Sequence, residues 1–195
     1  MPSTTPSTKW PATRPATERL CRVFWSATFA KQEEPAIDPS ATRDLTYGLF
    51  VLTSKDGDKD NGCICNTAVQ VASNPLRLMV SVQTENLTKE MIQRSGSFNV
   101  SVLTESVPFE TIRHFGMQSG RDVDKFESFS ATKRSANGLL YITENTNAMF
   151  SCKVVSQQDL GSHTLFIGEV TEAKVLGKAP SCTYAHYHKA IKPKF

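Results

Sequence analysis

Short segments of β-type residues, separated by turn residues, recur from residue 47 to residue 175, and they constrain the fold most. Tyr47–Ser54 and Arg77–Gln83 are rich in the aromatic and β-branched residues that favour strands. Lys55–Gly62, which precedes a strand predicted at Cys63–Val71, carries the Asp-Gly and Asn-Gly pairs typical of hairpin turns. Strands joined by such short turns are expected to be antiparallel neighbours.

Further strands and a few short helices follow the same pattern. The later predicted strands are Phe98–Leu103, Leu139–Thr143, Met149–Ser156 and His163–Val175. Capping residues and helical spacing predict helices at Pro39–Asp44, Asn86–Ser95 and Val107–Phe115. Because strands outnumber helices, the chain is predicted to be mainly β, a closed barrel with two or three small helices.

The N-terminal residues differ in composition from the rest of the chain. Six of the ten prolines, and none of the ten glycines, lie in the first forty positions. Residues 2–17 are mostly Pro, Ser and Thr, which bury too little apolar area to offset the entropy of ordering. We therefore expect a poorly ordered or extended tail at 1–37 and one domain at 38–195.

Charge and hydropathy exclude several classes of protein. Lys plus Arg is 22 and Asp plus Glu is 19, so the net charge of +3 lacks the basic excess typical of nucleic-acid proteins. No apolar run approaches the roughly 20 residues of a membrane span. Five cysteines fit a reducing compartment, so we expect a cytoplasmic protein. The acid-poor start also resembles an organellar transit peptide, although an ordinary N-terminal extension is the favoured interpretation.

Motifs for nucleotide triphosphates, dinucleotide-binding folds, zinc proteases and serine hydrolases are absent from the sequence. Cys63 and Cys65 share one face of a strand, and His186 and His188 form a similar pair. Both pairs are interpreted as packed structural residues, with a metal or redox site as the weaker alternative. His163, taken alone, is also interpreted as structural.

One cluster of polar residues has two equal interpretations. Ser81, Asn86 and Thr88, with Asn66-Thr67 before them, place hydroxyl and amide groups at strand ends and at the start of a helix. Free N–H groups at a helix N-terminus form phosphate sites, but Asn86 or Thr88 could equally serve as an ordinary cap.

Five blocks in residues 44–192 together resemble the flavin reductase-like family of FMN-binding split barrels. The blocks, in chain order, are LTYGLFVLTSKDGDKDNGCICNTAVQVASNP, LMVSVQTENLTKEMIQRSGSFNVSVL, FGMQSGRDVDKF, GSHTLFIGEVTEAKVL and TYAHYHKAIKPK. The resemblance is nearest to flavoredoxin-type NAD(P)H:flavin oxidoreductase domains, which occur alone or fused to rubredoxin. It implies a six-stranded antiparallel Greek-key split barrel with flanking helices, assembled as a homodimer.

The resemblance also implies a set of site residues. His163 is the catalytic candidate, placed where the nicotinamide would approach. The implied flavin-binding residues are Cys65, Asn66, Thr67, Ser81, Val82, Gln83, Asn86, Thr88, Phe115, Lys125 and Phe126. Many relatives have Ser-Ser where this chain has Asn66-Thr67, so FMN is the expected cofactor and FAD the alternative. No metal is expected.

The implied reaction is hydride transfer from NAD(P)H to bound flavin, followed by electron transfer to an acceptor. The protein would supply binding, orientation and electrostatics, and the flavin the redox chemistry. The main alternative is an electron carrier without NAD(P)H turnover, reduced and oxidised by partner proteins such as rubredoxin. A barrel without cofactor that serves as a binding module is a further alternative, and a metal-binding module is the most distant one.

Overall fold

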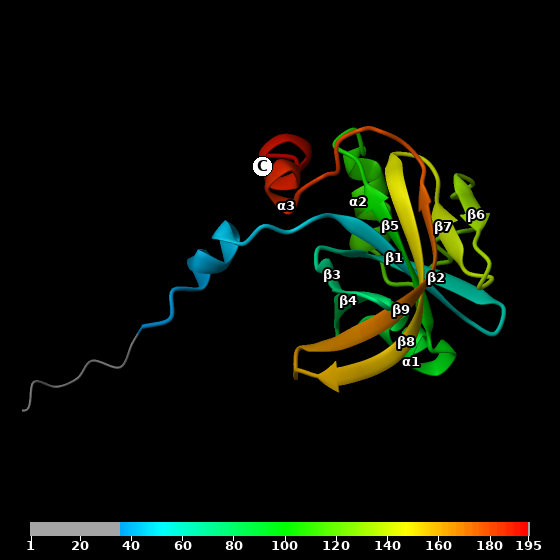
Figure 1. The fold of residues 1–195 in the computed structure, drawn as a ribbon. Coiled ribbons are helices and arrows are strands. Elements are labelled where there is room, and N and C mark those ends of the chain that lie inside the picture. The colour runs from blue at the N-terminus through cyan, green and yellow to red at the C-terminus, as the bar shows by residue number, and fades with distance from the viewer. Residues whose placement is uncertain (1–35, 195) are drawn as a thin grey trace, which may run out of the picture. The chain divides into compact units, whose positions relative to one another are not determined.

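A seven-stranded antiparallel sheet carries the fold of residues 36–194, the part of the chain that this computed structural model describes (Figure 1). The strands run in the spatial order β2-β1-β5-β8-β9-β4-β3, and β6 pairs with β7 in a separate two-stranded sheet. The strands are β1 (Phe50–Asp56), β2 (Lys59–Cys65), β3 (Ala68–Ser73), β4 (Leu76–Gln83), β5 (Ser97–Leu103), β6 (Thr132–Arg134), β7 (Leu140–Ile142), β8 (Thr146–Asp159) and β9 (His163–Val175).

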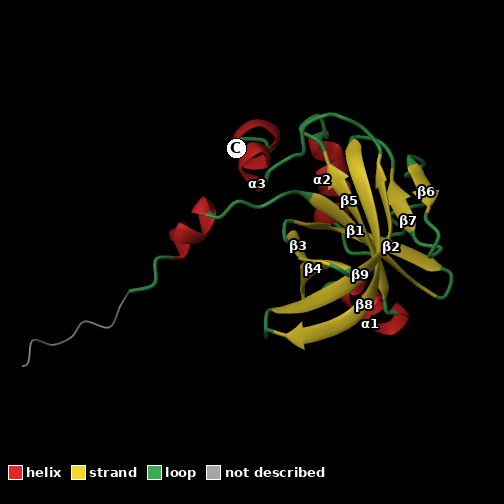
Figure 2. Ribbon diagram, viewed as in Figure 1, coloured by secondary structure: helices red, strands yellow, loops and turns green. Residues whose placement is uncertain are grey.

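Short helices accompany this sheet, so the predicted mainly β class is confirmed (Figure 2). They are the 3-10 helix η1 (Pro39–Asp44), α1 (Leu87–Ser95), α2 (Phe109–Gly116), α3 (Tyr184–His186) and the π-helix η2 (Tyr187–Ile191). The N-terminal tail predicted at 1–37 lies almost wholly outside the described residues, and its order stays a prediction. Within residues 36–194, no helix is long and apolar enough to cross a membrane.

The strand predicted at Cys63–Val71 is two strands in the structure. β2 ends at Cys65 and β3 begins at Ala68, with Asn66 and Thr67 between them. The backbone nevertheless stays attached to the sheet, because the Ser81 amide donates to the Thr67 carbonyl at 3.3 Å. This division gives the sheet seven strands where the resemblance implied six, and it turns the Asn66 side chain towards a cavity.

Local sequence signals account for α1. The Asn86 side chain accepts a hydrogen bond from the Thr88 amide at 2.9 Å, which caps the helix N-terminus. Gly96 ends the helix at φ +67°, a left-handed conformation that a residue without Cβ adopts at little cost. The predicted helix at Asn86–Ser95 is therefore confirmed, with Asn86 as the cap.

The core lies against the sheet in two clusters. Leu78, Val80 and Val82 alternate along β4 and are all buried in the first cluster, as their period-two spacing predicts. The second cluster packs β1 against α2 and the C-terminal residues, with Phe115 at its centre and Tyr187 at its edge. The predicted packing of the C-terminal aromatic segment against the barrel is thus confirmed.

The chain after β9 returns to the start of β1. An isolated bridge joins Gly48 to Thr183, and the Tyr184 amide donates to the Tyr47 carbonyl at 2.9 Å. These backbone contacts fix α3 and η2 beside the segment that enters the sheet.

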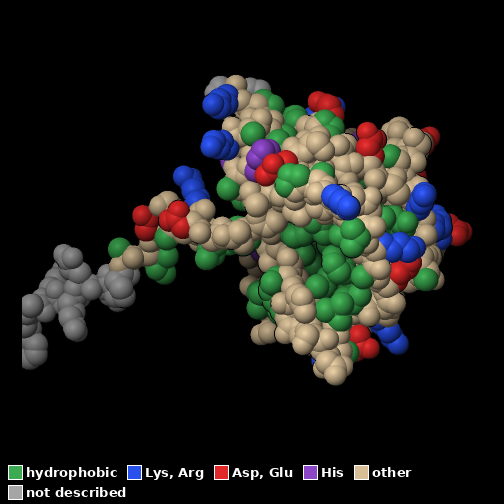
Figure 3. Space-filling view, turned by 45° about the horizontal axis from the view of Figure 1, so that its top comes forward, with side chains coloured by type: hydrophobic (Ala, Val, Ile, Leu, Met, Phe, Trp, Pro, Cys, Tyr) green, Lys and Arg blue, Asp and Glu red, His purple; other side chains and the backbone are tan. Residues whose placement is uncertain are grey.

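Figure 3 shows apolar side chains gathered in the middle of the face turned to the viewer, with charged side chains around them.

Candidate functional site

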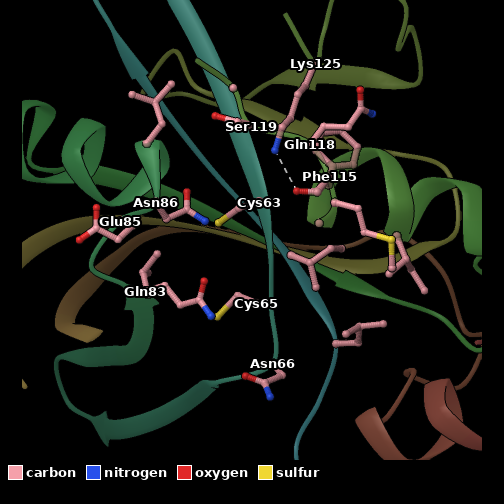
Figure 4. A pocket seen from close by; sticks show the side chains of 18 of the residues that line it. Cys63, Cys65, Asn66, Gln83, Glu85, Asn86, Phe115, Gln118, Ser119 and Lys125 are labelled. Atoms are coloured by element: carbon pink, nitrogen blue, oxygen red, sulfur yellow. Dashed lines mark hydrogen bonds between the residues drawn. The ribbon is translucent and has the colours of Figure 1, made fainter. Parts of the chain in front are cut away.

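A cavity of about 580 Å³ lies where β2, β4, α1, α2 and the C-terminal helices meet, and we call it the inner cavity. Its volume is in the usual range for sites that bind small molecules and cofactors. Residues from widely separated parts of the chain enclose it (Figure 4). Its lining residues are Leu49, Cys63, Ile64, Cys65, Asn66, Ser81, Val82, Gln83, Glu85, Asn86, Leu87, Ile112, Phe115, Gly116, Met117, Gln118, Ser119, Gly120, Lys125, His163, Tyr184 and Tyr187.

Lys125 places a buried ammonium group in the wall of the inner cavity. Its side chain is only 3% exposed, and its Nζ donates to the carbonyls of Gly62 and Phe115, both at 2.9 Å. Figure 4 marks the hydrogen bond to Phe115. Burial lowers the pKa of Lys125 from its ordinary value of 10.5. Within residues 36–194, no carboxylate forms an ion pair with this ammonium, so two carbonyl dipoles alone accept from it. The wall therefore presents a cation whose charge is not balanced by the protein.

The start of α1 forms the neighbouring wall. Asn86 lines the cavity, whereas Thr88 lies behind it, fully buried, with its hydroxyl accepting from Asn61 Nδ2 at 2.9 Å. The loop after α2 approaches so closely that a Cβ on Gly120 would lie 2.1 Å from the Asn61 side-chain oxygen. Asn61 thus links this loop to the helix N-terminus.

An ion pair on the surface strengthens that link. The Arg121 guanidinium donates to the Glu90 carboxylate, which joins the loop to α1, and this contact holds the pKa of Glu90 below its usual value. Ser119 and Gln118 come from the same loop and complete the polar end of the cavity beside Asn86.

Two thiols lie along the floor of the cavity. Burial raises the pKa of Cys63, and burial together with the neighbouring Cys63 raises the pKa of Cys65 to about 12. Both thiols are therefore protonated near neutral pH. Both cysteines are free thiols in the structure. Figure 4 shows the side-chain amide of Asn86 directed towards Cys63 and that of Gln83 towards Cys65.

The rim of the cavity is formed by the paired ends of β4 and β9. Gln83 lies opposite His163 in this pairing, so the imidazole stands beside the strand that carries Ser81. The His163 Nδ1 lies 3.0 Å from the Ser162 hydroxyl, which fixes the orientation of the ring. Among residues 36–194, no group of three or more His, Cys, Asp or Glu side chains is arranged to hold a metal ion.

Nine of the twelve residues implied by the resemblance line the inner cavity together. They are Cys65, Asn66, Ser81, Val82, Gln83, Asn86, Phe115, Lys125 and His163. Thr67 lines an adjacent cavity, Thr88 lies behind the wall, and Phe126 supports Phe115 at a ring distance of 5.5 Å. Sequence reasoning missed Gln118, Ser119, Tyr184 and Tyr187, whose aromatic and polar types give no local signal for a cavity.

This arrangement fits a phosphorylated flavin. Lys125, Asn86 and Ser119 offer positive charge and hydrogen-bond donors at one end, as a phosphate requires. Phe115, Val82 and the two neutral thiols offer a weakly polar surface next to this polar group, as an aromatic ring system requires. The fold and the site together define the class of the protein, a split-barrel domain with a site that fits a flavin.

The chain belongs to the family described as "Flavin reductase like domain", which matches residues 42–193. It is 42% identical over 153 residues to "High molecular weight rubredoxin" of Moorella thermoacetica, covering 78% of this chain and 66% of the relative. It is 37% identical over 158 residues to "Ferric-chelate reductase (NAD(P)H)" of Archaeoglobus fulgidus, covering 81% of this chain and 93% of the relative.

Solved structures share the fold. Flavoredoxin from Methanosarcina acetivorans matches with a TM-score of 0.63 at 23% identity, covering 73% of this chain and 75% of that chain. The resemblance to the flavin reductase-like family is therefore confirmed, and so is the class of the fold. The chain spans about two thirds of the rubredoxin relative and nearly the whole of the reductase.

Proposed function

We propose that this domain is an NAD(P)H-dependent flavin oxidoreductase that binds FMN in the inner cavity. The buried Lys125 ammonium carries the proposal, because a cation enclosed by two carbonyls and no carboxylate is stabilised by a bound anion. When bound, the flavin would supply the redox chemistry, taking up hydride from a nicotinamide and passing electrons onward. The ferric-chelate reductase relative, whose name specifies NAD(P)H, supports this choice of donor.

The residues of the inner cavity divide into two groups. We assign the phosphate end to Lys125 and Asn86, with Ser119 as a further donor. The hydroxyl of Thr88 already accepts from Asn61, so we assign Thr88 the role of fixing the helix start. Direct contact of Thr88 with phosphate, as the sequence suggested, stays a prediction.

We assign the ring end to strands β2 and β4 and to the residues between β2 and β3. The side chains concerned are Cys65, Asn66, Thr67, Ser81, Val82 and Gln83. Phe115 closes the cavity opposite these strands, and Phe126 supports it. His163 stands at the rim, where its imidazole can orient an incoming nicotinamide. FMN is the cofactor that we propose, and FAD stays the alternative.

Anaerobic mixing of the flavin-loaded protein with NADH or NADPH tests this proposal directly. The purified protein should absorb as a flavoprotein, release FMN on denaturation, and bleach its flavin band on addition of at least one of the two nucleotides. A colourless protein that stays colourless after FMN addition would refute the proposal. A yellow protein that neither nucleotide bleaches would refute the NAD(P)H-dependent activity alone.

The second candidate function is an electron carrier without NAD(P)H turnover. The rubredoxin relative favours it, because its name describes an electron-transfer protein of which this chain matches about two thirds. Reduced rubredoxin should then reduce the flavin of this domain, whereas the reductase proposal predicts electron flow from the flavin to rubredoxin. Stopped-flow absorbance with NAD(P)H alone, and then with rubredoxin, separates the two directions.

We also propose that the domain forms a homodimer through its apolar surface. Val69 and Val71 on the edge strand β3 are 48% and 47% exposed, and exposed apolar patches mark association surfaces. Light scattering of the purified chain should give twice the monomer mass. Replacement of both valines by Lys should yield a monomer, and a wild-type chain that is already monomeric would contradict the proposal.

A further inference from the structure

A second cavity, of about 930 Å³, opens beside the inner cavity, and we call it the outer cavity. It lies between η1, the residues that join β2 to β3, and the C-terminal helices. Its lining residues are Thr42, Arg43, Leu45, Tyr47, Asn66, Thr67, His163, Tyr184, Ala185, His188 and Lys192. Asn66, His163 and Tyr184 line both cavities, so the two meet at these three side chains. A molecule in the outer cavity can therefore reach the rim of the inner one.

The lining of the outer cavity is cationic. Arg43 and Lys192 carry permanent positive charge. No Asp or Glu is among the lining residues. The carboxylate next to these residues in the chain, Asp44, is not a lining residue, and Glu85 lines only the inner cavity.

Arg43 is also unlike the other arginines of the same domain, whereas Lys192 shares its lack of an ion pair with most of the described lysines. Within residues 36–194, the other arginines each pair with a carboxylate, namely Arg77, Arg94, Arg113, Arg121 and Arg134. In the same described part of the chain, neither Arg43 nor Lys192 forms an ion pair. Their charge is thus left for a ligand, and the chemistry of the cavity selects an anion.

An aromatic wall stands where the two cavities meet. The ring of Tyr184 contacts Tyr47 edge-on at 6.3 Å and His188 at 4.5 Å, and the Tyr184 amide donates to the Tyr47 carbonyl. The position of this ring is therefore set by the backbone. A flat heterocycle can stack there while its phosphates lie among Arg43 and Lys192.

We propose that the outer cavity binds the phosphorylated part of the pyridine dinucleotide and that its cations make the protein prefer NADPH to NADH. The two nucleotides differ only in the 2′-phosphate of the adenosine ribose. Sites for NADH place a carboxylate on the free 2′-hydroxyl, whereas sites for NADPH place a cation on the 2′-phosphate. The outer cavity has the cations and lacks the carboxylate. This inference rests on the proposed function, because it names the donor for the same flavin site.

Binding of nucleotide fragments to the flavin-loaded protein tests the inference without any turnover. Adenosine 2′,5′-bisphosphate should bind about tenfold more tightly than adenosine 5′-phosphate, as measured by calorimetry. Arg43→Ser and Lys192→Gln should each weaken the bisphosphate about threefold, the size expected for exposed charge pairs, and the double variant should abolish the preference. Both side chains are exposed, and no hydrogen bond or ion pair of theirs is found within residues 36–194, so both variants should fold normally.

A matched control and a kinetic measurement complete the test. Lys153→Gln removes an exposed lysine from β8 that lines neither cavity, and it should leave both affinities unchanged. In turnover, KM for NADPH should be below that for NADH, and the double variant should raise the former about tenfold with little change in the latter.

Two outcomes would overturn the inference. The first is equal affinity of the wild-type protein for the two fragments. The second is an equal loss of affinity for both fragments in the double variant. The two cations would then contact a phosphate that both nucleotides carry. The proposed function fails separately: if neither NADPH nor NADH bleaches the flavin, fragment binding still reports whether the outer cavity recognises a 2′-phosphate.

Discussion

The inner and outer cavities both present positive charge, but they do so in opposite ways. Lys125 of the inner cavity is 3% exposed and is held by two backbone carbonyls at 2.9 Å. Arg43 and Lys192 of the outer cavity are exposed and carry no such contacts within residues 36–194. A buried, fixed charge interacts strongly with one ligand, whereas exposed charges interact weakly and are screened by salt.

This difference matches the two tasks that we propose. A cofactor that stays bound through many turnovers benefits from a buried counter-charge whose position is set before binding. A substrate that must leave after each turnover benefits from weaker, exposed contacts, because tight binding of the ground state does not raise kcat. The contrast in burial therefore predicts a contrast in affinity, in pH dependence and in salt dependence.

Replacing Lys125 should have the largest effect. Lys125→Met keeps the length and most of the volume of the side chain but removes the charge that faces the cavity. Loss of a buried charge-assisted contact is worth about 2–3 kcal/mol, so FMN affinity should fall about 30- to 160-fold, measured by titration of flavin fluorescence. Lys133→Met, on an exposed strand position, should bind FMN normally.

The stability of the cofactor-free protein distinguishes a binding role for Lys125 from a folding role. Two carbonyls lose their donor in Lys125→Met, but a buried charge without a carboxylate partner is also removed. These effects oppose each other, so the Tm of the apoprotein should change little. A large fall in Tm with unchanged FMN affinity per folded molecule would show that Lys125 is a structural residue only.

The second prediction concerns pH. Burial lowers the pKa of Lys125 below 10.5, and only the protonated amine balances a phosphate. As pH rises through this lowered pKa, the amine loses its proton and FMN affinity should fall, by about tenfold and by no more than in Lys125→Met. Affinity should be constant from there down to about pH 7, where the amine is fully protonated and the phosphate of FMN still carries its second negative charge. An alkaline loss that persists in Lys125→Met would assign the pH dependence to another group.

Some of this site could be predicted from the sequence, because the signals are local. Asn86 and Gly96 bracket α1, and capping depends on residues at most four positions apart. The alternation of Leu78, Val80 and Val82 similarly depends only on the geometry of one strand. Such features can be read from the chain without knowledge of what packs against it.

Other parts of the site depend on contacts between distant segments. The Lys125 ammonium finds its acceptors on Gly62 and Phe115, which are 63 and 10 residues away. The division of the predicted strand at Asn66 depends on its pairing with β4, and the place of Tyr184 on its contact with Tyr47. The residue types alone predict none of these contacts, so Lys125 entered the prediction only through the family resemblance, and Tyr184 did not enter it.

A smaller effect is expected at Asn86. Asn86→Ala removes the N-cap of α1, which should cost about 1 kcal/mol of stability, and FMN affinity should fall about fivefold. Asn86→Asp separates the two roles, since its carboxylate can still accept from the Thr88 amide while its charge repels a phosphate. The Asp variant should therefore keep its Tm but lose FMN affinity. Equal FMN affinity in the wild type and the Asp variant would place the phosphate elsewhere.

Salt should have the smallest predicted effect. One range of NaCl concentrations compares ligand binding at the two cavities. Raising NaCl from about 50 to about 200 mM shortens the screening length of exposed charges, so KM for NADPH should rise about two- to threefold. FMN affinity should change less over the same range, because Lys125 lies beneath the protein surface. A cofactor affinity that falls with salt as steeply as KM rises would mean that exposed charges bind both ligands, and the two cavities would then differ in position but not in the way they recognise phosphate.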